Sequence, residues 1–175
     1  MLDSIDWSIL KILRENARSS TKKIAAALLA VGVRMSERGV ALRIERLENN
    51  GVVTGYTITA DPNKLGLPVT RITLIKFRMA KHFLGRIEEF KKYLMRAPHC
   101  VFACRTRGEI DWVNVMSFPS EDTADFESDW FRENFSDIIA DYKAYNIDSI
   151  RKESTAFYTD KELKDFLSNW AKRKP

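Results

Sequence analysis

Three short amphipathic segments, each with its own start and stop signals, fill the first fifty residues. Asp3 and Asp6 form a helix-start box, after which apolar residues recur at helical spacing to about Glu15. A turn follows, and Ser19 or Ser20 can cap a second helix whose apolar residues return with the same period. Helices this short are stable only when their apolar faces pack on one another, so the pattern predicts a compact helical domain.

The third segment is a helix that Ser36 caps and Gly51 ends. Val40, Ile44 and Leu47 share one face of this helix, and the opposite face is mixed but mainly basic. The third helix of a compact trio is the one that helix-turn-helix modules insert into DNA, which favours a reading helix. A solvated helix face is the alternative interpretation of the same charges.

The outward face of this third helix supplies the predicted DNA contacts. They are Ser36, Glu37, Arg38, Gly39, Leu42, Arg43 and Arg46. Arg38 and Arg46 are expected to contact bases, because a guanidinium pairs well with a guanine edge. Arg43 lies nearer the buried edge, so a phosphate or a neighbouring acid is its expected partner. Gly39 lowers helix stability but lets a partner's backbone approach closely.

Strand and helix patterns alternate cleanly after a turn-rich boundary near residues 61–66. Before that boundary, Val52–Ala60 is predicted to form a short wing or a connecting strand. After it, strands are predicted near 70–79, 100–107, 111–118 and 139–150, and helices near 83–97 and 121–135. This βαββαβ order is that of a ferredoxin-like fold, whose antiparallel sheet has helices on one face. The predicted fold class is α+β.

The chain is therefore divided into three parts. Residues 1–60 form a winged-helix-like helix-turn-helix domain with its linker strand, 61–158 a ferredoxin-like domain, and 159–175 an amphipathic helix with a basic tail. The uncovered face of the sheet needs a cover that a second subunit can provide, so a homodimer is expected. Thr159 and Glu162 resemble a capping box for the last helix, which is expected to cover apolar surface. Altered assembly, or a DNA contact through the tail, is the alternative role.

Positive charge is concentrated at the two ends of the chain. Residues 1–55 hold nine bases and six acids, 56–159 fifteen of each, and 160–175 five bases and three acids. This distribution is compatible with double-stranded DNA as a partner of the N-terminal part. Only Cys100 and Cys104 occur, and no apolar run approaches the length of a membrane span, so a cytoplasmic location is expected. No cofactor and no metal site are predicted.

Several of these segments match one known family in order and spacing. The match opens with Leu2-Asp3-Ser4-Ile5-Asp6 and continues through Asn16-Ala17-Arg18-Ser19. The largest group lies in the third helix and its exit, and comprises Ser36, Val40, Arg43-Ile44, Leu47-Glu48, Gly51-Val52-Val53 and Gly55-Tyr56. Over roughly residues 2–155 the chain resembles the Lrp/AsnC, or feast/famine, transcription regulators of bacteria and archaea.

The resemblance implies a sequence-specific regulator whose third helix enters the major groove. It also implies a regulatory domain that builds dimers and then tetramers or octamers, with an amino acid as effector. In that family the effector lies close to a Gly-x-x-Asp turn between the second and third strands, and Gly108, Glu109 and Asp111 fit that turn. Asp111 can hold an α-ammonium while amides of the turn face a carboxylate. An ordinary hairpin turn is the alternative.

One departure from the family pattern lies inside the helical domain. The stretch from Ala25 to Ser36 is several residues longer than usual, so either the second helix or the turn after it must differ.

Three other functions compete with specific regulation. A low-specificity architectural DNA-binding protein fits the mixed charge of the third helix, and a sensor that acts on other regulators needs no DNA contact. An enzyme on this architecture, similar to siroheme decarboxylases, is less favoured. His82 and His99 are the only histidines, and neither stands with a nucleophile or paired carboxylates, so no catalytic residue is predicted.

Overall fold

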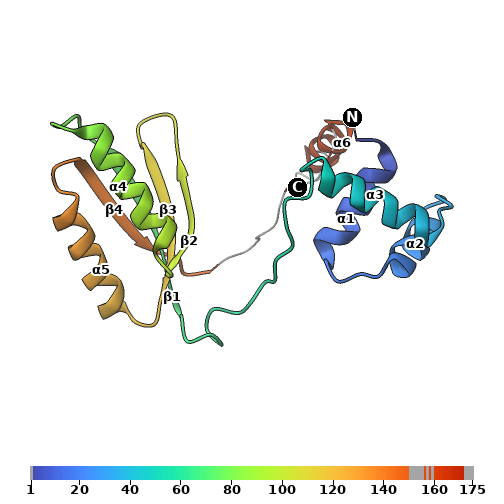
Figure 1. The fold of residues 1–175 in the computed structure, drawn as a ribbon, viewed down its shortest axis with the longest axis horizontal. Coiled ribbons are helices and arrows are strands. Elements are labelled where there is room, and N and C mark those ends of the chain that lie inside the picture. The colour runs from blue at the N-terminus through green and yellow to red at the C-terminus, as the bar shows by residue number, and fades with distance from the viewer. Residues whose placement is uncertain (1, 150–155, 157, 159, 172–175) are drawn as a thin grey trace. The chain divides into compact units, whose positions relative to one another are not determined.

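The computed structural model describes residues 2–149, 156, 158 and 160–171. The chain divides into two compact units (Figure 1). One contains the N-terminal helices together with the C-terminal helix, and the other contains the sheet and its two helices. No helix in the described part of the chain is long and apolar enough to cross a membrane.

The first unit begins with three helices, α1 (Ser4–Glu15), α2 (Thr21–Ala30) and α3 (Glu37–Asn49). Each begins where a side-chain oxygen can accept hydrogen bonds from free amides of the first turn, and the three caps are Asp3, Ser20 and Ser36. At the end of α3, Gly51 adopts a φ of 65°, which glycine tolerates best. The three predicted helices are confirmed.

The three helices bury one apolar cluster between them. Its fully or nearly fully buried members are Ile9, Leu10, Leu13, Ile24, Leu28, Val40 and Leu47. The connection between α2 and α3 turns at Gly32, whose φ is 83°, and the amide of Val33 donates to the carbonyl of Leu28. Part of the extra length between Ala25 and Ser36 therefore lies in this connection, which has six residues, 31–36.

The strand predicted for Val52–Ala60 is wrong. Residues 51–53 form a turn after α3, and residues 54–61 have no regular secondary structure. The β-forming residue types are present, but no strand of the described chain pairs with this segment, and an unpaired strand leaves its backbone groups without partners. Tyr56 is held from within the first unit, because its hydroxyl donates to Glu48 Oε1 at 2.6 Å.

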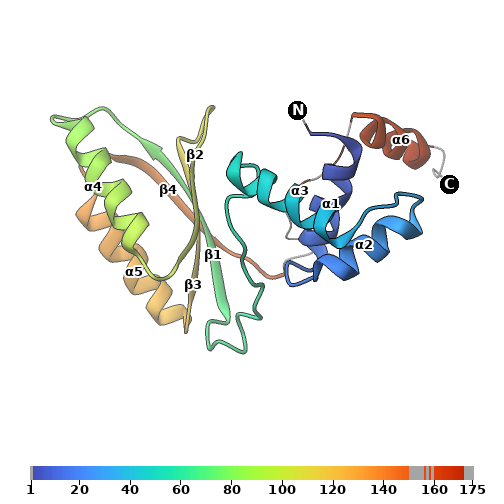
Figure 2. The same cartoon turned by 45° about the vertical axis from the view of Figure 1, so that its right-hand side comes forward.

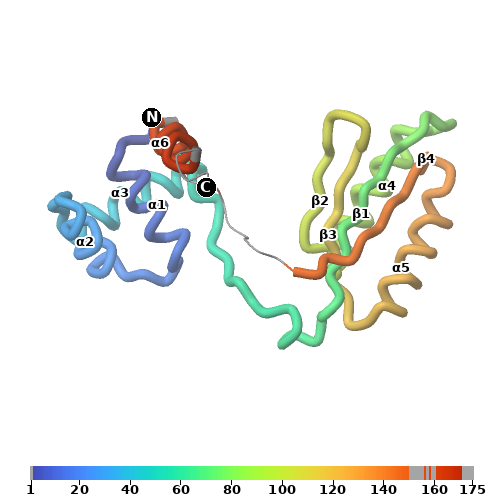
Figure 3. The backbone as a smooth tube through the Cα atoms, turned by 180° about the vertical axis from the view of Figure 1, so that it is seen from behind, coloured from blue at the N-terminus to red at the C-terminus, as the bar shows by residue number. Residues whose placement is uncertain are grey.

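The second unit is a four-stranded antiparallel sheet with two helices on one face, in the predicted βαββαβ order (Figure 2). Its elements are β1 (Val69–Phe77), α4 (Phe83–Arg96), β2 (Cys100–Arg105), β3 (Trp112–Phe118), α5 (Glu121–Asn134) and β4 (Ile139–Asn146). The strands lie in the order β2-β3-β1-β4, which Figure 3 shows from the open side of the sheet. The ferredoxin-like fold class is confirmed.

Alternation along the strands separates a core face from an open face. Ile75, Met116 and Phe118 point to the helices and pack with Phe90 of α4 and Phe131 of α5. Burying such large side chains contributes roughly 1.5–3 kcal/mol each, so this layer is the main source of stability of the unit. The alternate side chains of the same strands lie on the opposite face, which no element of the described unit covers.

The C-terminal helix α6 (Asp160–Ala171) forms as the sequence predicts, although Thr159 of its expected capping box and the basic residues 172–174 lie outside the described residues. An ion pair between Lys11 and Glu162 joins α6 to α1. The expected cover of apolar surface is not seen in the single chain, because the apolar side chains of α6 stay at least 41% exposed. They are Leu163, Phe166, Leu167 and Trp170.

Candidate nucleic-acid interface and effector site

The outward face of α3 is exposed and carries few internal bonds. Arg38 is exposed, and Leu42 keeps 56% of its surface accessible. Within the described residues, Arg38 forms no ion pair. Glu37 and Glu45 are also exposed, so the face carries both signs of charge. An unpaired guanidinium and an apolar side chain one turn apart are suited to a guanine edge and a thymine methyl group.

Arg43 and Arg46 differ from Arg38 because both bind a buried carboxylate. Asp6 of α1 has no exposed surface and accepts from Arg43 Nη1 at 2.7 Å and from Arg46 Nη2 at 2.6 and 2.8 Å. Arg43 also donates to Asp3 at 2.6 Å. A buried carboxylate needs such partners, so both arginines brace α3 against α1. Of the two partners predicted for Arg43, the structure contains the neighbouring acid.

Asp3 has two roles at this point. Its side chain caps α1 by accepting from the amides of Ile5 and Asp6, and it also receives Arg43. The amide of Asp6 and the Arg43 guanidinium hold the pKa of the Asp3 carboxyl below its usual value of 3.8. The sequence identifies the cap, but it does not reveal that the same motif receives an arginine forty residues later.

The structure gives a reason for the glycine at position 39 that is independent of DNA and that the sequence did not suggest. A Cβ at this position would lie 3.1 Å from Met35 Cγ and 3.3 Å from Ser36 Oγ. The amide of Gly39 donates to that same Ser36 hydroxyl at 3.1 Å, which caps α3. The absence of a side chain therefore lets the cap and Met35 pack closely, whether or not DNA approaches.

The start of α3 adds one cation that the sequence reasoning left out. Arg34, in the connection before Ser36, is exposed and forms no ion pair among the described residues. Together with Arg38 it flanks the first turn of α3, where free amides and the helix dipole favour an anion. A phosphate of a DNA backbone is an anion of that kind.

In the second unit, the turn between β2 and β3 holds Asp111 in place. Gly108 has a φ of 142°, in a region that favours glycine. The amide of Thr106 donates to the carbonyl of Asp111 at 2.9 Å and so closes the turn. One carboxylate oxygen of Asp111 accepts from the amide of Phe77 at 2.8 Å. Asp111 is thus fixed by the end of β1 as well as by its own turn.

Asp111 lines a cavity of about 610 Å³ beside the first half of α4. Its other charged lining residues are Arg78, Glu88, Lys91 and Arg105, and its apolar wall includes Phe83, Ile87 and Trp112. Lys91 already pairs with Glu88 at 2.7 Å. Gly108 and Glu109, which the sequence grouped with Asp111, are exposed and do not line this cavity. Because Lys91 and Glu88 pair with each other, one acid, Asp111, and two bases, Arg78 and Arg105, remain beside the apolar wall. Such a set of charges suits a zwitterion.

The open face of the sheet carries two rows of largely apolar side chains. Phe102, Val115, Ile72 and Tyr145 face one another across the four strands in one row. Cys104, Val113, Leu74 and Lys143 form the next row. Phe102 and Tyr145 are 52% and 53% exposed. Contiguous patches in which most side chains are apolar are typical of surfaces that associate with another molecule.

A three-helix reading domain followed by a ferredoxin-like domain defines the class of two-domain helix-turn-helix transcription regulators. Residues 2–48 match the AsnC-type helix-turn-helix domain. The transcriptional regulator LrpA of Pyrococcus horikoshii is 36% identical over 109 residues, which cover 59% of this chain and 74% of LrpA. LrpC of Bacillus subtilis is 31% identical over 107 residues, which cover 61% of this chain and 67% of LrpC. The chain therefore belongs to the Lrp/AsnC family of DNA-binding transcription regulators.

Solved structures agree with this fold. The structure of B. subtilis LrpC has a TM-score of 0.71 at 25% identity and covers 87% of this chain and 98% of its own. The transcriptional regulator NMB0573 of Neisseria meningitidis, solved as a complex with L-Met, has a TM-score of 0.77 at 20% identity. That match covers 93% of this chain and 99% of the other. All three of these relatives are named as transcriptional regulators.

Proposed function

We propose that this regulator reads operator DNA in the cytoplasm through the first half of α3. Arg38 contacts a guanine edge, Leu42 contacts a thymine methyl group, and Arg34 with the amides near Ser36 contacts phosphates. The observation that carries this proposal is that Arg38 is exposed and has no ion partner among the described residues, while Arg43 and Arg46 are bound to Asp6. Arg46 remains half exposed, so it adds at most a secondary contact to DNA.

Footprinting on DNA fragments selected from the genome tests this proposal. Two reading domains related by a two-fold axis must meet the same groove on successive turns, so the protected site should be roughly palindromic. Its half-sites should be about 10 base pairs apart, or a multiple of that spacing. Protection of a single unpaired half-site, or uniform protection of all fragments, would contradict specific reading by a dimer.

The open face of the sheet is the proposed dimer interface. Two rows of side chains run across its four strands, one with Phe102 and Tyr145 at its ends and the other with Cys104 and Lys143 at its ends. These rows would stack on the same rows of a second copy. A two-fold interface buries the same patch on both subunits, so one exposed face is enough to build it. Dimers would then associate further into tetramers or octamers.

An amino acid is the proposed effector, bound in the cavity beside Asp111. The α-ammonium would pair with Asp111, and the carboxylate with Arg105 or Arg78 at the same cavity. The NMB0573 complex with L-Met supports an amino acid as a ligand class of this fold. A ligand that has different affinities for the DNA-bound and the DNA-free protein changes the affinity for DNA. DNA then changes the affinity for the ligand by the same factor.

Calorimetry with the twenty amino acids tests the effector proposal. Asp111→Asn is the sharpest variant, because an amide oxygen can still accept from Phe77 while the charge is lost. We expect at least one ligand at millimolar concentration, and a loss of at least about tenfold in affinity for Asp111→Asn. Glu109→Gln is the matched control, since Glu109 does not line the cavity. Equal binding to the parent and Asp111→Asn would remove the cavity as the effector site.

A further inference from the structure

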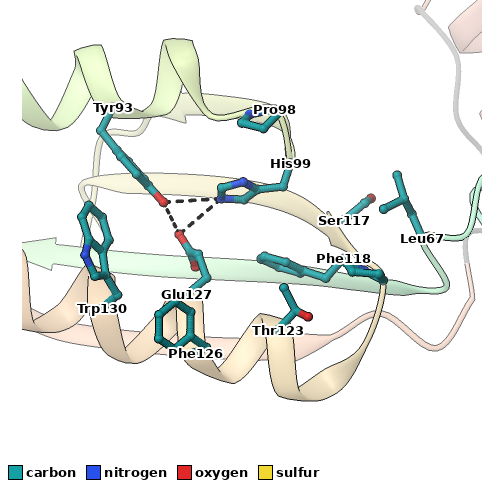
Figure 4. A pocket seen from close by; sticks show the side chains of 11 residues that line it. Leu67, Tyr93, Pro98, His99, Ser117, Phe118, Thr123, Phe126, Glu127 and Trp130 are labelled. Atoms are coloured by element: carbon teal, nitrogen blue, oxygen red, sulfur yellow. Dashed lines mark hydrogen bonds and ion pairs between the residues drawn. The ribbon is translucent and has the colours of Figure 1, made fainter.

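A second cavity lies at the other end of α4, away from Asp111. Its volume is about 580 Å³, within the range of sites that hold small organic ligands. Tyr93 of α4, His99 in the turn after it and three residues of α5, Phe126, Glu127 and Trp130, line it (Figure 4). None of these residues belongs to the DNA-reading helix or to the proposed effector cavity.

The polar centre of this cavity is a buried carboxylate. The side chain of Glu127 is 10% exposed, and one of its oxygens accepts from the Tyr93 hydroxyl at 2.7 Å. His99 Nε2 lies 3.4 Å from that same oxygen. Burial, together with the bond to Glu127, raises the pKa of the Tyr93 hydroxyl well above its usual value, so this partner stays neutral. Within the described residues no lysine or arginine pairs with Glu127.

Aromatic rings surround this carboxylate. The Tyr93 and Trp130 rings lie 5.2 Å apart, as do the His99 and Phe118 rings. Phe126 extends the wall and remains 73% exposed. A carboxylate that has no lysine or arginine partner among the described residues and is enclosed by aromatic rings attracts a positively charged group by both Coulomb and cation–π interactions.

The two cavities differ in what they offer a ligand's carboxylate. The Asp111 cavity has three basic residues, Arg78, Lys91 and Arg105. No lysine or arginine is among the described residues that line the Glu127 cavity. A carboxylate bound there would be desolvated beside the acidic side chain of Glu127, with no lysine or arginine among the described lining residues to pair with it, which is unfavourable. A free amino acid therefore suits the first cavity, whereas an amine without a carboxyl group suits the second.

We propose that the Glu127 cavity binds an organic amine with an apolar body and no carboxylate, its ammonium paired with Glu127 and enclosed by Tyr93 and Trp130. This site is separate from the effector site and from the DNA interface, so it does not depend on either of those proposals.

Three compounds of matched size test this site: 2-phenylethylamine, 2-phenylethanol and L-phenylalanine. Binding is measured by calorimetry on the full chain carrying Asp111→Asn. This substitution removes the charge that would hold an ammonium group in the other cavity. We expect the amine to bind at least about tenfold more tightly than the alcohol and the amino acid. Glu127→Gln, added to the same chain, should lower amine affinity at least about tenfold, since Gln keeps the acceptor for Tyr93 and loses the charge.

Asp122→Asn is the control for charge alone, because Asp122 is an exposed acid of the same helix that does not line the cavity. It should leave amine affinity unchanged. Phe126→Ala removes an exposed wall residue and should weaken the amine severalfold even if Glu127→Gln folds poorly. The proposal is overturned if the amine binds no better than the alcohol, if the amino acid binds equally well, or if neither Glu127→Gln nor Phe126→Ala weakens the amine.

Discussion

The carboxylate of Asp6, which has no exposed surface, accepts two hydrogen bonds from Nη2 of Arg46, forty residues further along the chain. This contact joins the first turn of α1 to the second half of α3, the proposed reading helix. The orientation of α3 therefore depends on a residue that sequence patterns identify only as part of a helix cap. It also divides the basic residues of α3 into those that support the fold and those that are free to meet DNA.

Asp6→Asn should lower the free energy of unfolding by roughly 1.5–3 kcal/mol, the range for hydrogen bonds to charged groups. The loss should stay near this range because Arg46 is half exposed and can turn to water. Thermal or denaturant unfolding of the full chain measures it. Glu45→Gln, an exposed acid on α3, is the control and should have little effect. Equal stability of the two variants would mean that the Asp6 contacts do not brace the helices.

Arg38→Ala and Arg46→Ala should separate recognition from folding. Arg38→Ala should cost about 1–3 kcal/mol of specific DNA binding at an unchanged melting temperature. Arg46→Ala should lower the melting temperature, because Asp6 loses one of its two arginines. DNA titration and thermal unfolding are measured on the same preparations. The assignment of Arg38 would be wrong if its removal left operator affinity unchanged.

Part of the free energy of unfolding depends on pH through the carboxyl group of Asp3. Its pKa is lower in the folded chain than its usual value of 3.8, so the stabilisation is fully present above that value. It is lost as the pH falls through the lower folded value. Asp3→Asn keeps a good cap without the charge, so the stability difference between parent and variant should shrink as the pH is lowered from 7 to below 3.8. A difference that is constant with pH would contradict this linkage.

Phe102→Glu should weaken the dimer without unfolding the chain, because Phe102 is 52% exposed on the open face of the sheet. A charge there would be desolvated at a two-fold interface and would face its own copy or a nearby apolar row. Met95→Glu is the matched control, since Met95 is 86% exposed and lies on α4, on the helical side. Sedimentation should show dissociation for Phe102→Glu alone. Equal association of both variants would exclude this face as the dimer interface.

The sequence predicts the regular elements well because each has a local cause. The caps Asp3, Ser20 and Ser36 and the periodicity of apolar residues act within one or two turns, so the helices appear where they are expected. The strand at Val52–Ala60 fails for the opposite reason, because a strand requires a partner that residue types alone do not supply.

The sites are less predictable because their residues come together only through tertiary contacts. Asp111 is predicted by a short motif, but two other residues of the cavity come from elsewhere in the chain: Arg78 directly follows β1, and Arg105 ends β2. Glu127 could be interpreted only as a solvated helix charge, since its burial depends on α4 and the turn at His99. Residue spacing along one element carries no information about such contacts.

Competition between selected genomic fragments and random DNA, at one fixed salt concentration, tests the reading role of α3 most directly. Phosphate contacts contribute equally to both kinds of DNA, so only contacts of α3 with base edges, or with sequence-dependent shape, raise the ratio of the two affinities. The parent protein should prefer a selected fragment by about 10³ or more, and Arg38→Ala should lower that ratio while leaving affinity for random DNA nearly unchanged. A ratio near one for the parent, or a ratio that Arg38→Ala does not change, would contradict specific recognition through this helix.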